Sequence, residues 1–154
     1  MYNEITITGP QEDLQKFYDG LITDPEEGTL SILDSYYPLP QEVKDTEGAW
    51  YDWCCTYWGS KWGDYNTDYN ESYNGTLKGF FLSAWDTPTE GFVEVSKRWP
   101  SLHFRIDYHE CGMNFRGWYT IENGSLEQEQ WEMSKNDWDE LGYETEEEPE
   151  EGEE

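Results

Sequence analysis

A high content of aromatic side chains sets the limits within which this sequence can fold. Tryptophan, tyrosine and phenylalanine together account for 18% of the residues, with 9 Trp, 12 Tyr and 6 Phe. The formal charge of −26 and the hydrophobic fraction of 35% would by themselves be typical of a disordered chain. Disordered acidic chains are poor in aromatic residues, however, so we expect a folded domain whose small core is built from large side chains.

Length and charge narrow the class of protein further. A chain of 154 residues predicts one domain. The chain has 35 acidic and 9 basic residues. This balance excludes binding to nucleic acid or to an anionic membrane by electrostatic attraction alone, since both need an excess of lysine and arginine. The sequence shows no signal peptide, no membrane span, and an odd number of cysteines that does not suggest a disulfide framework. A reduced, cytoplasmic protein is therefore expected.

The alternation of apolar and polar residues predicts the order of the secondary-structure elements. The expected elements, in chain order, are a strand over 4–8, a helix over 10–22, a strand over 29–33, a short helix over 48–57, an edge strand or ordered loop over 62–70, a strand over 76–85, a helix from Thr87 to just before Pro100, a strand over 102–108 and a hairpin of 114–121 with 125–131. Asn123-Gly124 within this hairpin is a strong turn signal. At the start of the second long helix, Thr87, Pro88 and Glu90 fit a capping box.

Two strand–helix–strand units in this order predict an α+β fold of the ferredoxin-like type, a split β-α-β sandwich. Its antiparallel sheet would carry the helices on one face, with an insertion at about 45–75 between the two halves and the hairpin at the C-terminal end. This domain would occupy residues 1–135. Residues 136–154 contain 11 acidic and no basic residues, so we expect an acidic, largely disordered tail there.

Three segments resemble the signatures of a known family. They lie at 53–62 (Trp-Cys-Cys-Thr-Tyr-Trp-Gly-Ser-Lys-Trp), 83–88 (Ser-Ala-Trp-Asp-Thr-Pro) and 108–117 (Tyr-His-Glu-Cys-Gly-Met-Asn-Phe-Arg-Gly). These segments are similar to the patterns Trp-Gly-Thr-Lys-Trp, Thr-Ala-Trp-x-Pro-Pro and Glu-x-Gly-Met-x-Phe-x-Gly of the YubB-like ferredoxin-like domain of phages and plasmids, and the resemblance extends over about residues 2–130. It implies a ferredoxin-like fold and a mobile-element protein in the cytoplasm of a bacterial host cell. It implies no reaction.

A tryptophan-rich segment is a candidate ligand pocket. Three tryptophans fall within ten residues around one lysine. Indole faces can stack on a planar ligand while the ammonium group pairs with a phosphate or carboxylate. The candidate set for a nucleotide-type ligand or a peptide side chain is Trp53, Trp58, Lys61, Trp62, Trp85 and Arg116. The alternative is that these tryptophans form the core of a chain with few aliphatic residues.

The sequence gives little support for catalysis or for a metal. Cys54, Cys55, His109 and Cys111 do not have the paired spacing of a zinc site. Neither histidine stands in a motif with a nucleophile, and no glycine-rich phosphate loop is present. We therefore expect a protein without enzymatic activity, catalytic residues, a bound metal or another cofactor.

The excess of acidic residues suggests a basic binding partner. A surface dense in carboxylates can imitate nucleic acid, because B-DNA presents about one negative charge per 1.7 Å of its axis. Asp64, Asp68 and Glu71, interleaved with tyrosines, would form such a row on the insertion. The partner would be a basic host protein, with a nucleic-acid-binding defence nuclease as the leading class, and neither nucleic acid nor a membrane would bind directly. The alternative explanation of the acidity is solubility.

Three hypotheses about function follow from these features. The first is an accessory protein of a phage or plasmid that binds and inhibits a host defence component by acidic mimicry of nucleic acid. The second is a protein that binds and sequesters a small nucleotide-type signal in the tryptophan-rich pocket. The third is an interaction domain with no role in defence.

Overall fold

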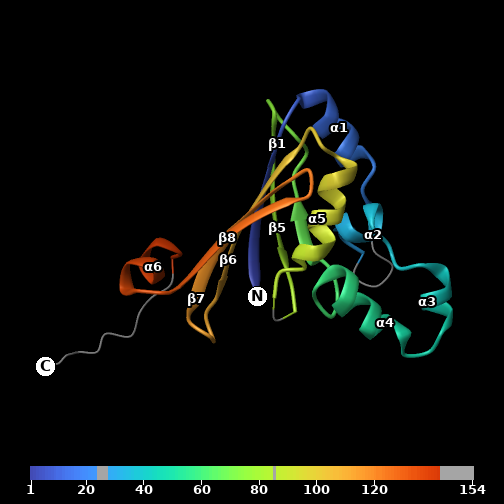
Figure 1. Ribbon diagram of the computed structural model, residues 1–154. Coiled ribbons are helices and arrows are strands. Elements are labelled where there is room, and N and C mark those ends of the chain that lie inside the picture. Colours follow the sequence, from blue (N-terminus) through green and yellow to red (C-terminus); the bar gives the residue numbers. More distant parts are fainter. Residues whose placement is uncertain (24–27, 85, 143–154) are drawn as a thin grey trace, which may run out of the picture.

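The computed structural model describes residues 1–23, 28–84 and 86–142. Six antiparallel strands form one sheet in the order β4-β5-β1-β6-β7-β8, and two long helices cover one of its faces (Figure 1). The strands of this sheet are β1 (Tyr2–Thr8), β4 (Tyr65–Tyr69), β5 (Thr76–Leu82), β6 (His103–Glu110), β7 (Phe115–Glu122) and β8 (Ser125–Glu132). The two long helices are α1 (Gln11–Asp19) and α5 (Thr89–Arg98).

The connections between these elements are those of a ferredoxin-like fold. β1, α1 and β4 form the first half, and β5, α5 and β6 form the second. β1 lies between β5 and β6 and pairs antiparallel with both, so that Ile5 lies opposite Gly79 on one side and Ile106 on the other. The hairpin of β7 and β8 continues the sheet beyond β6. The molecule therefore has the α+β sandwich expected from the sequence.

The strand that completes the first half differs from the one expected. The sequence predicts a strand over 29–33, whereas the structure has only the two-residue β3 (Leu30–Ser31), which pairs with β2 (Ile22–Thr23) in a separate ribbon. The chain then turns into the short helix α2 (Ile32–Tyr36), because the Asp64 carboxylate accepts the N–H of its first residue. The place of the predicted strand in the main sheet is taken by β4.

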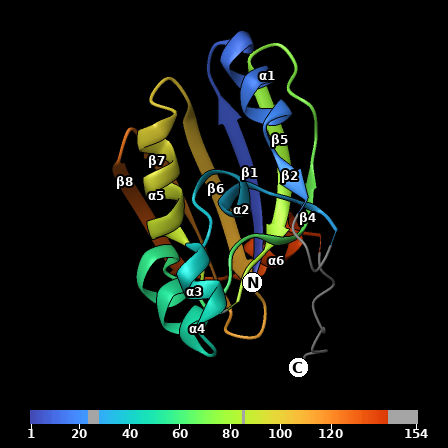
Figure 2. The same cartoon turned by 90° about the vertical axis from the view of Figure 1, so that its right-hand side faces the viewer.

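The insertion begins earlier than the predicted 45–75 and ends before β4. It runs from the end of α1 to the start of β4, and its helices lie beside the lower end of α5 (Figure 2). After α2 these helical elements are α3 (Gln41–Asp45), α4 (Ala49–Trp53) and the π-helical turn η1 (Cys54–Trp58). The polar sequence of β4 carries no apolar run because this strand lies at an edge of the sheet, so the sequence alone did not separate it from the insertion.

The core lies between the sheet and the two long helices. Its fully buried side chains are mainly aliphatic residues and phenylalanines, among them Ile5, Ile7, Leu14, Phe17, Leu33, Leu77, Phe81, Phe92, Val95, Phe104 and Ile106. Phe81 from the sheet packs on Phe92 from α5, with ring centroids 5.4 Å apart. Among the described tryptophans only Trp58 is buried, and Trp53 and Trp99 pack around the core. Of the tryptophans in the candidate pocket, Trp58 therefore belongs to the core and Trp53 packs against it, whereas Trp62 is exposed and Trp85 lies outside the described residues.

The start of α5 is held by a contact with β1 and has no capping box. Pro88 is the residue before the helix, and no side chain caps its first turn. Thr87 instead donates its hydroxyl to Oδ1 of Asn3 at 2.6 Å in the interior. Asn3 in turn donates to the hydroxyl of Ser83 at 2.9 Å. The residue predicted as the N-cap thus joins the α5 end to the central strand.

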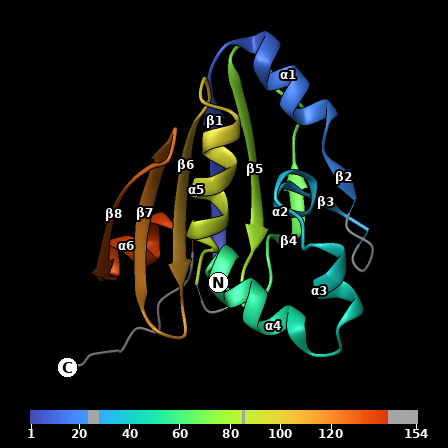
Figure 3. The same cartoon turned by 45° about the vertical axis from the view of Figure 1, so that its right-hand side comes forward.

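A short helix continues the chain where the sequence predicts a disordered tail from residue 136. This helix, α6 (Lys135–Glu140), begins at a complete capping box. Arg116 on β7 pairs with Asp137 at 3.1 Å and with Glu140 at 2.7 Å. α6 lies on the face of the sheet opposite to α5 (Figure 3). The folded part therefore extends past residue 135, and residues 143–154 of the predicted tail lie outside the described residues.

Candidate functional site

The first two tryptophans of the predicted pocket pack against each other beside the core. Trp58 is 3% exposed and donates its indole N–H to the carbonyl oxygen of Tyr37 at 2.9 Å. Trp53 packs edge-on against Trp58, with ring centroids 5.6 Å apart. The Trp58 ring is therefore enclosed by protein and offers no face to a ligand.

Trp62, which is exposed, and Lys61, which is half-buried, form a separate pair. The Trp62 side chain is 41% exposed and stacks on Trp50 of α4, with ring centroids 6.2 Å apart. The Lys61 ammonium group lies 4.6 Å from the centre of the Trp62 ring, which is a cation–π contact. Lys61 thus contacts its chain neighbour, and these two residues do not share a pocket with the buried Trp58.

The last two residues predicted for the pocket do not complete it. Trp85 lies outside the described residues. Arg116 is opposite Trp131 of β8 and shares with it the face of the sheet that α1 and α5 leave uncovered, and its guanidinium carbon lies 5.7 Å from the Trp131 ring centre. Trp58 lies beside Gly91 of α5, on the covered face. Because the sheet separates Arg116 from the tryptophans, its assignment to their pocket is wrong.

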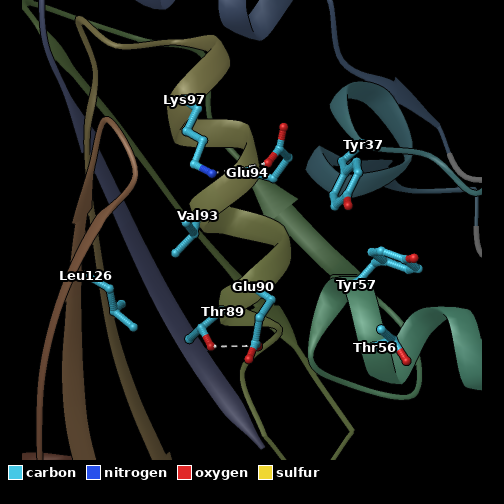
Figure 4. Close-up of a pocket in the computed structure, with 9 residues that line it drawn as sticks. All are labelled: Tyr37, Thr56, Tyr57, Thr89, Glu90, Val93, Glu94, Lys97 and Leu126. Carbon is cyan, nitrogen blue, oxygen red and sulfur yellow. Dashed lines mark hydrogen bonds and ion pairs between the residues drawn. The ribbon is translucent and has the colours of Figure 1, made fainter.

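A groove of about 310 Å³ lies between α5, η1 and the β7–β8 hairpin (Figure 4). Its walls are formed by Tyr37, Thr56, Tyr57, Thr89, Glu90, Val93, Glu94, Lys97 and Leu126. Figure 4 shows Tyr37 and Tyr57 on the side of the insertion and Leu126 on the side of the sheet. Glu94 pairs with Lys97 at 3.7 Å and with Arg98 at 3.3 Å, so both of these cations are already engaged, and Glu90 adds a second carboxylate to the walls. The groove therefore suits a neutral or cationic ligand better than a phosphate-bearing one.

Asp64, predicted to belong to an exposed acidic row, is buried and holds part of the insertion to the sheet. Its exposed fraction is 3%. One carboxylate oxygen accepts the backbone N–H of Ile32 at 2.7 Å and the hydroxyl of Tyr69 at 2.6 Å. The other oxygen accepts the N–H of Leu33 at 3.1 Å and the hydroxyl of Ser31 at 3.0 Å. Burial raises the pKa of Asp64 to about 6, while these hydrogen bonds act in the opposite direction. Asp64 cannot reach a partner, so its place in the partner-binding row is wrong.

The other two residues of the predicted row lie at the surface. Asp68 is an exposed residue of β4. Glu71 is also exposed, and it accepts a hydrogen bond from the Gln15 side chain of α1 at 3.2 Å. The row predicted on the insertion is therefore reduced to two carboxylates near the β4 edge of the sheet, one of which is engaged by α1.

The opposite edge of the sheet carries a denser set of carboxylates that sequence reasoning missed. All eight residues of β8 are exposed, and the strand contains three glutamates and no basic residue. Exposed carboxylates of α6 follow it. We call these residues the acidic edge: Glu127, Glu129, Glu132, Asp139 and Glu140. The Glu-Gln-Glu-Gln run of β8 indicates this exposure in the sequence, because a strand whose side chains are polar on both faces has both faces in water.

Two glutamates of the acidic edge point in the same direction. Glu127 and Glu129 project from the uncovered face of the sheet, because side chains alternate along a strand and Trp131, two residues further, pairs with Arg116 on that face. At a rise of 3.3–3.4 Å per residue, their positions are about 7 Å apart along β8. Arg116 is already engaged by two carboxylates of α6, so it does not neutralise this pair.

Burial alters the chemistry of two reactive side chains. Cys54 is buried, which raises the pKa of its thiol to about 12, so the thiol stays protonated at neutral pH. Burial and the nearby Arg116 lower the pKa of His109. Within the three described ranges, no group of three or more His, Cys, Asp or Glu side chains is placed to hold a metal ion. None of the helices that the structure describes is long and apolar enough to cross a membrane.

Strand order, connections and the helix-covered sheet define the molecule as a ferredoxin-like α+β domain. The chain belongs to the family of the ferredoxin-like domain in Api92-like protein, whose sequence model matches residues 64–151, more than half of its length. The matched part includes every strand of the main sheet except β1, and it includes both elements that carry the acidic edge. The match supports the predicted fold class but does not confirm the finer assignment to the YubB-like domain of phages and plasmids.

One solved structure is similar to the chain over a limited region. It is the crystal structure of protein Api92 from Yersinia pseudotuberculosis, with 19% sequence identity and a TM-score of 0.47. The similarity covers 55% of this chain and 31% of the Api92 chain, so the chain spans about a third of the length of that protein. No curated protein matches the chain.

Proposed function

We propose that the chain is a non-enzymatic binding domain that holds a basic protein at the acidic edge. The observation that carries this proposal is β8, an outermost strand with eight exposed residues, three glutamates and no basic residue. Beyond the end of the strand, Glu140 and Asp139 of α6 are exposed but already pair with Arg116 at 2.7 Å and Lys135 at 3.3 Å, so the β8 glutamates carry most of the free negative charge. A partner with clustered lysines and arginines would be attracted from a distance and would form several charged contacts at once.

Acidic mimicry of nucleic acid is the mode of binding that this edge supports best. Successive phosphates of one DNA strand are about 3.4 Å apart along the helix axis. Glu127 and Glu129 are about 7 Å apart along β8, which corresponds to every second phosphate. The whole strand extends over about 25 Å, the length of about seven base pairs. The acidic edge therefore has the charge spacing that a basic nucleic-acid channel would accept.

The proposed partner is a nucleic-acid-binding defence protein of a bacterial host, with restriction and RNA-guided nucleases as the first classes to test. The resemblance to the YubB-like domain supports an origin in a phage or plasmid, and such elements must evade these nucleases. The same resemblance supports a location in the cytoplasm of the host cell. Nucleic acid and anionic membranes would not bind directly, because the charge of −26 repels both.

The test compares two variants that carry the same change in charge. The first variant reverses the β8 glutamates: Glu127→Lys, Glu129→Lys and Glu132→Lys. The matched control reverses three exposed glutamates of α1 and the insertion: Glu12→Lys, Glu42→Lys and Glu47→Lys. Purified nucleases of both classes, and purified basic proteins that are not nucleases, would be passed over the immobilised protein at about 50 mM and about 200 mM salt.

A basic nuclease should be retained at low salt and released at high salt. The β8 variant should bind it at least about tenfold more weakly than the wild type, and the control should bind within about twofold. Equal weakening of both variants, or no retention of any nuclease at low salt, would refute the proposal. Selective retention of basic proteins other than nucleases would support the interaction domain without a role in defence.

A second candidate function is supported by the groove between Tyr37 and Tyr57. We propose that it binds a small planar ligand that is neutral or cationic. This differs from the nucleotide-type signal expected from the sequence, because Lys97 and Arg98 already pair with Glu94 and Glu90 is a second carboxylate in the walls. Trp53, whose ring centroid lies 5.0 Å from that of Tyr57, would report binding by a change in fluorescence. Titration with benzamidine should show this change in the wild type and lose it in Tyr57→Ala. No change in the wild type would count against the groove.

A further inference from the structure

The two edges of the main sheet are finished in different ways. β4 has a break in register between Tyr65 and Asp68, and the Thr67 hydroxyl donates to the Leu30 carbonyl oxygen of β3 at 2.5 Å. β8, in contrast, pairs only with β7 among the described residues, and its full length is exposed. Sheets usually cover or interrupt their edges, because unpaired backbone groups accept further strands. At the β8 edge, the charge of the glutamates is the feature that opposes pairing with an unrelated strand.

The register of β8 shows which of its backbone groups point outward. Glu122 and Ser125 flank a two-residue turn and form a closely hydrogen-bonded pair. At the far end Met133 donates its N–H to the carbonyl oxygen of Asn114 at 3.0 Å. Bonded and non-bonded pairs alternate in an antiparallel ladder, so residues 125, 127, 129 and 131 bond to β7. The backbone N–H and C=O groups that point away from the sheet are those of Leu126, Gln128, Gln130 and Glu132.

We propose that this edge binds an extended, basic segment of a partner protein as a seventh strand, antiparallel to β8. The inference rests on the proposed function, because it states how a basic partner is held at the acidic edge. Four outward N–H groups and four outward C=O groups would pair with the main chain of the segment. These hydrogen bonds would supply affinity, while the glutamates would select the sequence.

Charge decides between a basic segment and a second copy of this chain. β8 carries three glutamates and no basic residue. If two copies paired antiparallel about Gln128, Glu127 of each copy would lie opposite Glu129 of the other. Like charges directly opposite destabilise a sheet, whereas opposite charges at the same positions stabilise it. The strand therefore favours a segment that places lysine or arginine opposite its glutamates.

The faces of β8 predict the pattern of the segment. Glu127 and Glu129 lie on the uncovered face, so basic residues at alternate positions would meet them. Leu126, which is 37% exposed, lies on the opposite face and lines the groove beside α5. Apolar β-branched residues suit the intervening positions of the segment, because they pack well on a half-buried strand.

The test uses three peptides with one sequence, Thr-Lys-Val-Lys-Val-Arg-Val-Thr, and blocked ends. One is unmodified, one is N-methylated at the valines, and one is N-methylated at the basic residues. With the basic side chains on the face of Glu127 and Glu129, the valine amides of an antiparallel strand point toward β8 and the amides of the basic residues point away. Methylation of the valines should reduce affinity at least about tenfold, while methylation of the basic residues should leave it within about twofold.

A backbone variant of the protein tests the same contact from the other side. Gln128→Pro removes one outward N–H and leaves the hydrogen bonds to β7 in place, a change that an edge strand accommodates. Gln128→Ala is the matched control, since it keeps this N–H. Both variants have the charge of the wild type. We expect the proline variant to bind the unmodified peptide at least about tenfold more weakly than the alanine variant, with equal dependence on salt.

The outcomes distinguish strand addition from the proposed function. If both methylated peptides bind as tightly as the unmodified one, strand addition is overturned and a charge-only contact at the acidic edge stands. If no peptide binds at about 50 mM salt, strand addition is overturned, and retention of nucleases decides the proposed function by itself. If Gln128→Pro does not fold, the two methylated peptides decide the matter on the unaltered chain.

Discussion

Replacing Asp64 by asparagine should destabilise the fold, although the change removes a negative charge from a strongly acidic protein. The carboxylate accepts four hydrogen bonds, and each of its oxygens accepts one backbone N–H, from Ile32 or from Leu33. Asparagine has one side-chain oxygen, so its NH₂ group faces one of these two N–H groups whichever way the amide is turned. The hydroxyls of Ser31 and Tyr69 can rotate to accept, but a backbone N–H cannot.

The size of the effect follows from this count. A buried N–H group that loses its acceptor costs about 1–3 kcal/mol. For a domain of this size, 1 kcal/mol lowers the Tm by about 2–4 °C, so a loss of about 2 kcal/mol predicts a Tm lower by about 4–8 °C. Asp64→Ala leaves both N–H groups without an acceptor and should cost about twice as much.

Thermal unfolding followed by circular dichroism near neutral pH measures this change, and urea titration gives the free energy of unfolding. Asp68→Asn is the matched control, because it makes the same substitution at an exposed position of β4 and should change the stability by less than about 0.5 kcal/mol. An Asp64→Asn variant that melts within about 1 °C of the wild type would refute the buried four-bond arrangement.

Three further changes test the packing of α5, its junction with β1 and one buried titratable group. Gly91→Ala should lower the free energy of unfolding, measured by urea titration, by about 1–3 kcal/mol despite the better helix propensity of alanine. The new methyl group would lie 2.9 Å from a methyl carbon of Leu33. A more stable variant would show that α5 can shift. Thr87→Val should cost about 1–3 kcal/mol, since the buried Asn3 oxygen loses its donor, and an unchanged urea midpoint would count against that contact. Burial lowers the pKa of His109 below its usual 6.5, so the unfolded chain binds the proton more readily than the folded chain. As the pH drops through about 6.5, the wild type should therefore lose stability relative to His109→Gln, and parallel pH profiles of the two proteins would contradict this.

Much of the sheet could be predicted because its signals are local. The alternation over 4–8 and 102–108 reappears in β1 and β6. Asn123 and Gly124 have φ angles of 46° and 85°, the left-handed conformation that a two-residue hairpin turn requires. For 62–70 the sequence leaves an edge strand and an ordered loop open, and β4 lies there as an edge strand. A short polar edge strand has no periodic apolar signal, so its pairing with β5 is what defines it.

The candidate sites were harder to predict because they depend on contacts between residues far apart in the sequence. Residue type alone groups Lys61 and Arg116 with the tryptophans, whereas the fold places Arg116 on the other face of the sheet. Thr87 has the sequence context of an N-cap, yet its hydroxyl binds Asn3, 84 positions away. Neither the face on which Arg116 lies nor the hydrogen bond from Thr87 to Asn3 can be read from the neighbouring residues in the sequence.

The sequence by itself determined that the chain is acidic, folded and of the ferredoxin-like α+β type, since net charge is independent of conformation and strand and turn signals are local. Only the tertiary structure decided which carboxylates can meet a partner, because the exposure of each one depends on what the fold brings against it. Asp64 is buried by donors from residues 31–33 and from Tyr69. Glu127 and Glu129 are exposed together because β8 is the last strand of the sheet, with no described strand beyond it to cover its edge.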